Sequence, residues 1–286
     1  MHDALGDRMK EYYEDRTRYK LMRRGYTIIR LDGKAFHSYT QGLQRPFDDG
    51  LITDMNETAR YLCKNIMGCK LAYVQSDEIS LVLTDFDKIG TQSWFDGNIQ
   101  KMISVAASMA TIKFNHLRLM RNVKKEGVDG YAMGYEGQLL ADYEIESHKF
   151  AMFDARVFQV PTRSEAINYL IWRQQDATRN SIQLVAQSLY SQNELHGKKT
   201  DVLQEMIFQK GQNWNDLSPR KKRGCVIQKI TEVTEMNLQS IDMMSDNTMS
   251  NRYTGTTRSN WVVRIDTPIF TQDKEFLTGI IPSNHE

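Results

Sequence analysis

Two short acidic stretches of the sequence carry residues that could do chemistry. Asp32 closes the apolar run in IIRLDG, and Asp77 with Glu78 lies in YVQSDEISLVL. Mg²⁺ prefers oxygen ligands and is usually held by one or two carboxylates together with substrate phosphates. Acids on neighbouring strands can share two such ions, one activating an attacking oxygen and the other steadying the leaving group. The pair indicates a phosphoryl-transfer site, although each stretch alone also fits an ordinary turn.

Cationic side chains flank these acids along the chain. Lys34 and His37 follow the first acidic stretch directly, Arg45 lies in the next loop, and Lys101 and Arg156 come later. Such groups can neutralise a triphosphate without reading the identity of a base. His37 fits a packed core histidine equally well, because aromatic residues stand beside it in the sequence.

The elements that must position these groups follow from the periodicity of the apolar residues. Apolar runs and alternation predict a strand over 25–33, a hairpin over 71–83 and a strand over 150–161. A 3.6-residue period predicts core-facing helices over 50–67 and about 94–117. The resulting order predicts an α+β fold, a ferredoxin-like β-α-β-β-α-β antiparallel sheet with helices on one face. The first strand of such a sheet lies beside the hairpin, so the two acidic stretches are expected to meet.

The remaining segments flank this unit. We predict an amphipathic surface helix over 4–23 and a turn-rich segment over 121–149. We expect a catalytic domain over 1–160, with a mostly helical and short-strand region over 161–286 packed on it. The elements predicted in that C-terminal region are helices over 164–192 and 199–210, a basic loop over 218–224, and short strands over 225–230 and 261–266.

Composition limits the class of protein. Lys and Arg number 37 against 36 Asp and Glu, a net charge of +1, so any site for a polyanion must be local. Three cysteines, Cys63, Cys69 and Cys225, have neither metal-ligand spacing nor the density of a disulfide scaffold, which favours a reducing compartment. No signal-peptide pattern or run of roughly 20 apolar residues occurs. We therefore expect a soluble, cytoplasmic protein with no membrane partner.

Several motifs together resemble a known family. The pairing of RLDGxxFH with QSDExS is followed by KMISVAAS, FDARVF and YLIWRQQDA, in order, within about residues 5 to 230. This series resembles that of the tRNA(His) guanylyltransferase family and its guanylyltransferase-like relatives. The resemblance implies a palm-like catalytic domain, similar to that of polymerases but used in reverse, so that nucleotides are added to the 5′ end of a tRNA.

The resemblance also implies substrates, a cofactor and an assembly. ATP or GTP would first activate the 5′-monophosphate of the tRNA by nucleotidyl transfer, and the 3′-hydroxyl of an incoming nucleoside triphosphate would then attack. Two Mg²⁺ ions would assist, and the protein would form a homotetramer. The partners implied are therefore tRNA, nucleoside triphosphates and further copies of the chain.

Site residues are assigned by matching positions of the family's motifs. Metal coordination falls to Asp32, the Gly33 carbonyl and Asp77, with Glu78 as the adjacent catalytic acid. The residues assigned to nucleotide contacts are Gly33, Lys34, Ala35, Phe36, His37, Arg45, Ser76, Asp77, Lys101 and Arg156, with Arg30 beside them. Those assigned to RNA contacts are Arg173, Asn180, Arg220, Lys221, Lys222 and Arg223. A solvated charge run is the alternative for the last four.

One departure from the family's pattern bears on the activity. Where the eukaryotic guanylyltransferases carry His-Ile-Asn-Asn, this chain has Thr178, Arg179, Asn180 and Ser181. The like-proteins that lack the motif are associated with template-dependent repair of 5′-truncated tRNA, and the sequence groups with them. Three alternatives stay open: untemplated addition of the extra guanosine to tRNA(His), a nucleotide cyclase or dinucleotide synthase on the same palm, and a non-catalytic RNA-binding module whose acids only cap turns.

Overall fold

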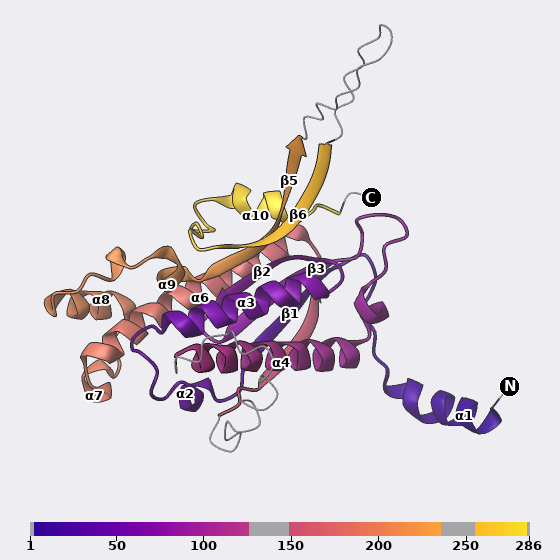
Figure 1. Ribbon diagram of the computed structural model, residues 1–286, viewed down its shortest axis with the longest axis horizontal. Helices are drawn as coiled ribbons and strands as arrows, with labels where there is room; N and C mark the ends of the chain where they lie inside the picture. The colour runs from indigo at the N-terminus through magenta and orange to yellow at the C-terminus, as the bar shows by residue number, and fades with distance from the viewer. Residues whose placement is uncertain (1–2, 126–148, 236–254, 285–286) are drawn as a thin grey trace, which may run out of the picture.

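A six-stranded antiparallel sheet runs through the centre of the protein. The structure is a computed structural model that describes residues 3–125, 149–235 and 255–284. Its strands are ordered β4-β1-β3-β2-β5-β6, and the first four confirm the predicted β-α-β-β-α-β arrangement (Figure 1). The strands are β1 (Tyr26–Gly33), β2 (Cys69–Gln75), β3 (Glu78–Thr84), β4 (Phe153–Val160), β5 (Cys225–Glu235) and β6 (Gly255–Arg264).

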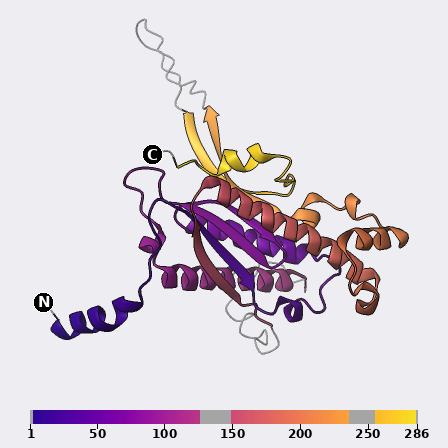
Figure 2. The ribbon, with the colours of Figure 1, turned by 180° about the vertical axis from the view of Figure 1, so that it is seen from behind.

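Helices cover both faces of the sheet. On β1, Ile29 and Leu31 pack into a core with α3 and α4, whereas Ile28 packs into a second core with α6 and α10. Figures 1 and 2 show these two layers on opposite sides of the strands. The α-helices are α1 (Ala4–Met9), α2 (Phe36–Tyr39), α3 (Asp49–Asn65), α4 (Ile99–Lys125), α6 (Arg163–Leu189), α7 (Gln192–Leu195), α8 (Thr200–Gln209), α9 (Pro219–Arg223) and α10 (Lys274–Ile280).

The C-terminal strands are longer than predicted. β5 pairs with β2 only as far as Gln228, which lies opposite Leu71. Beyond that position β5 and β6 continue as a two-stranded ribbon that leaves the body of the molecule (Figure 1). Thr231 and residues 258–260, the outermost positions whose burial the structure describes, are exposed, so no buried face imposes alternation there and the predicted strands are too short. The C-terminal region thus contributes strands to the central sheet, and the predicted domain boundary after residue 160 stays a prediction.

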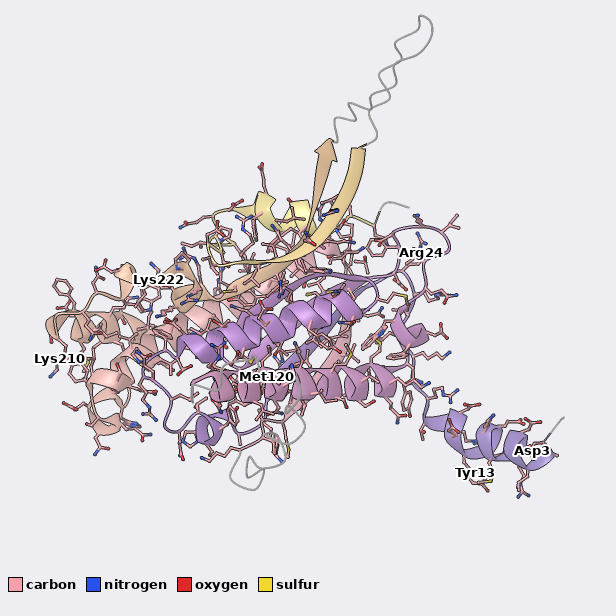
Figure 3. All side chains as sticks on the ribbon, viewed as in Figure 1. Asp3, Tyr13, Arg24, Met120, Lys210 and Lys222 are labelled. Atoms are coloured by element: carbon pink, nitrogen blue, oxygen red, sulfur yellow. The ribbon has the colours of Figure 1, made fainter. Side chains whose placement is uncertain are left out.

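Two predicted helices have different bounds. The N-terminal helix, predicted over 4–23, continues from α1 only as a π turn (Lys10–Glu14) and a 3₁₀ turn (Asp15–Thr17). Its apolar side chains are exposed, as Tyr13 shows on the arm that leaves the body (Figure 3). The helix predicted from residue 94 starts at Ile99, because the preceding 3₁₀ turn (Trp94–Gly97) has left-handed backbone.

Three further predictions concern segments outside the sheet. The basic segment predicted as a loop forms the short helix α9. Ser218 is its N-cap, Pro219 is its first residue, and Gly224, whose φ is +74°, is its C-cap. Most of the turn-rich segment over 121–149 lies outside the described residues. Within the described ranges, no helix is long and apolar enough to cross a membrane. The 3₁₀ turn before α9 spans Trp214–Asp216.

Candidate active site

Asp32 and Asp77 meet at one end of the sheet, called here the acid end. The backbone N–H of Gly33 donates to the carbonyl of Asp77 at 3.1 Å, which joins the end of β1 to the turn between β2 and β3. Asp32 lies opposite Glu78 on β3 and opposite Asp154 on β4. Burial raises the pKa of Asp77, and the neighbouring charges of Asp32 and Glu78 add to the rise. Negative charge has therefore accumulated here that a bound cation would stabilise.

The donor set at the acid end fits a hard cation that also takes substrate oxygens. Among the described residues no group of three or more His, Cys, Asp or Glu side chains is arranged to hold a metal by itself. Asp32 and Asp77 offer two carboxylate groups, and the Gly33 carbonyl offers a third ligand group. Mg²⁺ typically binds one or two protein carboxylates and completes its coordination with water and phosphate oxygens. A site with few protein ligands therefore fits this ion.

Glu78 has a buried partner that the sequence did not indicate. Both of its carboxylate oxygens accept hydrogen bonds from Arg173 on α6, each at 2.7 Å, and both side chains are almost fully buried. Arg173 also pairs with Asp176 at 3.0 Å. Burial raises the pKa of Glu78, although the guanidinium acts in the opposite direction. The predicted contact between Arg173 and RNA is therefore wrong, because its cationic group is enclosed and already paired within the protein.

Gly33 has a steric reason to lack a side chain. A Cβ at this position would lie 2.2 to 2.7 Å from the ring of Phe36, which is buried in an aromatic cluster under α2. We expect Gly33→Ala to destabilise the fold by about 1–3 kcal/mol and to weaken GTP binding, because the displaced ring carries His37 with it. Urea unfolding and GTP titration measure both effects. Gly90→Ala, which adds a methyl group in open space, should change neither.

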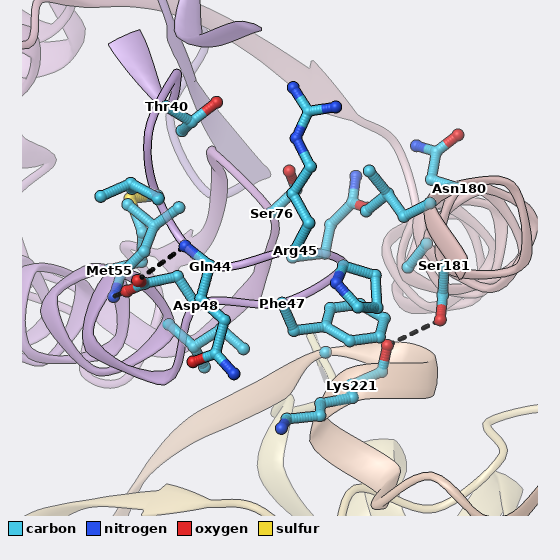
Figure 4. A pocket seen from close by; sticks show the side chains of 18 of the residues that line it. Thr40, Gln44, Arg45, Phe47, Asp48, Met55, Ser76, Asn180, Ser181 and Lys221 are labelled. Atoms are coloured by element: carbon cyan, nitrogen blue, oxygen red, sulfur yellow. Dashed lines mark hydrogen bonds between the residues drawn. The ribbon is translucent and has the colours of Figure 1, made fainter. Parts of the chain in front are cut away.

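A large pocket opens beside the acid end. Its volume is about 660 Å³, and it lies between the loop after α2, the turn of the β2–β3 hairpin, α6 and α9. Figure 4 shows Arg45, Ser76, Asn180 and Lys221 arranged around it, one from each of these elements. It collects residues predicted separately for nucleotide and for RNA contacts: His37, Arg45 and Ser76 from the first set, and Asn180, Arg220 and Lys221 from the second.

His37 and Ser76 reach this pocket through local backbone geometry. His37 is exposed on the single turn of α2, while its neighbour Phe36 is buried, so the alternative of a core histidine is wrong. Ser76 lies in the tight turn with a φ of +49°, which is sparsely populated for a residue other than glycine. Such conformations persist where the surroundings impose them, and here the two paired strands do so.

Lys101 does not reach the acid end. Asn115, in the second half of α4, donates to the carbonyl of Ala151 at 2.8 Å, and the next carbonyl, of Met152, accepts from the N–H of Lys34 at 2.8 Å. The late part of α4 therefore lies at the acid end. Lys101 is in its first turn, about 20 Å from Asn115 at 1.5 Å per residue. Within one subunit, the predicted contact of Lys101 with a nucleotide at the acid end is wrong.

The remaining residues predicted to contact a nucleotide differ in exposure. Lys34 and Ala35 are exposed beside the acid end, but the ring of Phe36 is 5% exposed and belongs to the core, so the structure does not support a contact between that ring and a nucleotide. Arg156 is exposed on β4 opposite Arg30, on the sheet face that carries Asp32.

The basic cluster of α9 is divided by its contacts. Arg220 and Lys221 line the pocket and pair with Asp49 at 2.5 and 3.2 Å. Lys222 donates to the carbonyl of Asn215 and Arg223 donates to the carbonyl of Thr267, so the last two cations of the cluster are turned onto the chain itself. Contacts with RNA stay a prediction for Arg220 and Lys221, and the structure favours a structural role for Lys222 and Arg223.

Sequence reasoning missed several residues that line the pocket. Asp48 accepts the N–H of Leu51 at 2.7 Å as the N-cap of α3, a role that its position before an apolar-periodic stretch could have indicated. Phe47 lies with its ring 5.9 Å from the ammonium of Lys221, and Ser181 donates to the carbonyl of Lys221 at 2.8 Å. No local pattern marks these two, because their contacts join segments far apart in the chain.

Comparison with known proteins agrees with this geometry. The family model described as tRNAHis guanylyltransferase matches residues 6–161. The chain belongs to the tRNAHis guanylyltransferase family. Members of this family are nucleotidyltransferases, so the protein is an enzyme of that class.

Solved structures of this family share both fold and length with the chain. A bacterial tRNA(His) guanylyltransferase-like protein in complex with ATP is 39% identical, with a TM-score of 0.73 over 98% of this chain and 99% of that one. The complex of such a bacterial protein with GTP is 40% identical, with a TM-score of 0.70 over 96% and 97%. These likenesses confirm the predicted palm-like fold. A curated relative, the probable tRNA(His) guanylyltransferase of Dictyostelium discoideum, is 27% identical over 73% of this chain and 77% of its own.

Proposed function

We propose that this member of the tRNAHis guanylyltransferase family adds nucleotides to the 5′ end of tRNA in the 3′-to-5′ direction, as template-dependent repair of 5′-truncated tRNA. The observation that carries the proposal is the acid end itself, where Asp32 and Asp77 stand beside a pocket with room for a nucleotide. Nucleotide binding is supported by the bacterial like-proteins, whose structures are complexes with ATP and with GTP.

The reaction we propose has two transfers. An oxygen of the tRNA 5′-monophosphate attacks the α-phosphorus of ATP or GTP, and pyrophosphate leaves. The 3′-hydroxyl of an incoming nucleoside triphosphate then attacks the activated 5′-phosphorus, loses its proton to solvent, and displaces the nucleoside monophosphate. Both steps move charge between phosphate oxygens, so positioning and electrostatic stabilisation supply most of the catalysis.

The residues of the acid end have distinct parts in this proposal. Asp32, Asp77 and the Gly33 carbonyl would hold two Mg²⁺ ions, which when bound neutralise charge on the transferring phosphate. His37, Arg45 and Ser76 would hold the nucleotide from the pocket side, with Asn180 facing them from α6. The exposed amine of Lys34 would contact a phosphate.

Two further parts of the proposal concern organisation. We propose that residues 1–160 form the catalytic domain and that the region over 161–286 supplies tRNA contacts, and that the protein assembles as a homotetramer in the cytoplasm. The segment Thr178–Ser181 supports repair in place of untemplated guanosine addition, since it has only one of the two asparagines that the eukaryotic enzymes carry there, Asn180. Asn180 lines the pocket, as does Ser181. The second candidate, untemplated guanosine addition to tRNA(His), is favoured by the names of the curated relatives.

The two candidates predict different products. We expect a nucleotide complementary to the template to be added to 5′-phosphorylated tRNA that lacks its first nucleotide, for each of the four templating bases, and no addition to intact tRNA. Labelled nucleotides and Mg²⁺ with matched tRNAs measure this directly. Guanosine added whatever the template would favour the second candidate. A cyclic product formed from nucleoside triphosphates without RNA would instead identify a cyclase.

A further inference from the structure

The indole of Trp172 on α6 is held in a fixed orientation yet remains half exposed. The guanidinium of Arg173 lies over its ring at 4.6 Å, and the ring of Tyr169 meets it edge-on at 5.9 Å. Both neighbours are themselves fixed, since Arg173 binds Glu78 and the hydroxyl of Tyr169 lies 2.8 Å from Ser80 Oγ. Even so, 48% of Trp172 is exposed to solvent.

This ring stands close to the acid end. Arg173, which touches it, is bonded to Glu78, and Glu78 lies directly across the β1–β3 pair from Asp32. One ion pair and one strand spacing thus separate the indole from Asp32, a distance on the order of 10 Å. Such a distance is within reach of the terminal nucleotides of an RNA strand whose 5′ end lies at Asp32.

The indole does not belong to the nucleotide pocket. The residues of α6 that line the pocket include Ala177, Asn180, Ser181 and Leu184. At 100° per residue, the middle of that stripe is roughly 130° around the helix axis from Trp172. A nucleotide in the pocket and a base against Trp172 would therefore lie on different sides of α6.

Cations accompany the indole on its side of the helix. Arg30 and Arg156 lie opposite each other on β1 and β4, on the face of the sheet that α6 covers, two residues from Asp32 and Asp154 along their strands. Arg30 also lies opposite Ser80 on β3, whose hydroxyl meets that of Tyr169, which places it beside the same group. Arg156 is 58% exposed and its one ion-pair partner in the described residues is Asp154, at 3.9 Å. A rigid aromatic face next to one exposed and one partly buried guanidinium group is the chemistry that binds an unpaired nucleotide, the base by stacking and the phosphate by charge.

We propose that Trp172 is a stacking surface for an unpaired terminal base of the substrate tRNA, with Arg30 and Arg156 holding the adjacent phosphates. This inference rests on the proposed function, because it takes tRNA as the strand at the acid end. It adds a binding residue on the side of α6 away from the pocket, so that the tRNA end and the incoming nucleotide approach Asp32 from two directions.

Steady-state kinetics with 5′-truncated tRNA test the proposal. We expect Trp172→Leu, which keeps apolar contact with Tyr169, to raise the KM for tRNA by about 10- to 100-fold and to leave the KM for GTP unchanged. Trp172→Phe, which still stacks, should recover most of the affinity. Tyr61→Ala is the matched control: Tyr61 is also partly exposed, at 37%, under a cation, Lys113 at 5.7 Å, but lies on α3 across the sheet. The KM of the Tyr61→Ala variant for tRNA should not change.

A binding measurement keeps the test independent of turnover. Quenching of tryptophan emission by 5′-truncated tRNA should be smaller in Trp172→Phe than in the wild type, and this comparison needs no catalysis, so it stands even if the addition assay shows the proposed function to be wrong. An unchanged KM for tRNA in Trp172→Leu, or a rise confined to the KM for GTP, would overturn the proposal. So would equal quenching of the two proteins.

Discussion

Asp77→Asn is expected to abolish nucleotide addition to 5′-truncated tRNA while making the folded protein more stable. In the proposed site the amide would not replace the carboxylate as a ligand for Mg²⁺, and losing that charge stabilisation would lower the rate by about 1000-fold or more. The same change removes a partly buried negative charge that lies beside Asp32 and Glu78. In the presence of a chelator the melting temperature should therefore rise, by about 2 °C or more.

The stability of the wild type and of Asp77→Asn should depend differently on pH. The pKa of Asp77 is raised in the folded protein, so folding favours the protonated form. Its contribution to stability is present below the pKa of an unfolded aspartate and is lost as the pH rises through the raised value. The wild-type melting temperature, followed upward from acid in chelator, should show that loss, and the Asp77→Asn curve should lack it. Asp87→Asn, an exposed acid paired with Lys70 at the far end of β3, should leave activity within about 2-fold. Full activity in Asp77→Asn would contradict the site.

Arg173→Met is expected to destabilise the protein by about 3–5 kcal/mol and to lower activity at any temperature where the variant is folded. The substitution leaves Glu78 buried without the two hydrogen bonds from Arg173, next to Asp32. Urea unfolding gives the first effect and initial rates give the second. Because Glu78 directly follows Asp77, where the turn ends and β3 begins, relaxation of the unpaired glutamate is expected to displace the acid end.

A double variant separates the pair from the bulk of the side chain. Arg173→Met combined with Glu78→Gln removes the unpaired charge and should recover part of the stability lost in the single variant. Arg118→Met is the control, because its buried partner Asp54 keeps a second arginine, Arg121, at 2.6 Å. A double variant no more stable than Arg173→Met alone would show that the ion pair is not what holds α6 at the acid end.

The sheet and the meeting of its acids could be predicted because each depends on local pattern. The strand before Asp32 and the hairpin around Asp77 have strong apolar alternation and clear turn residues, and the order of elements leaves few ways to arrange them. Once the order was known, the two acids had to lie on adjacent strands. The hydrogen bond between the backbones of Gly33 and Asp77 brings the two acids together.

Partners distant in sequence could not be predicted in the same way. The bond between Glu78 and Arg173 spans 95 residues, and an arginine on an amphipathic helix looks the same whether it is solvated or buried. Lys101 was placed on the correct helix, but periodicity does not tell which end of a helix lies at the acid end. The lengths of β5 and β6 were predicted too short for a different reason: Thr231 and residues 258–260, the outermost positions whose burial the structure describes, are exposed, so no buried face imposes alternation there.

The helix α6 constrains how this protein can change over evolution. Arg173, Trp172 and the pocket residue Asn180 all belong to this one helix, each facing a different direction. Deleting a single residue between Arg173 and Asn180 would turn the pocket stripe by about 100° relative to the ion pair, so the number of residues between them is fixed. The identity of residue 180 is freer, since a substitution of Asn180 changes the pocket wall without moving Arg173. If this wall selects the addition mode, as in the proposed function, a lineage could exchange one mode for another by point substitutions, while insertions and deletions in the same stretch would be eliminated.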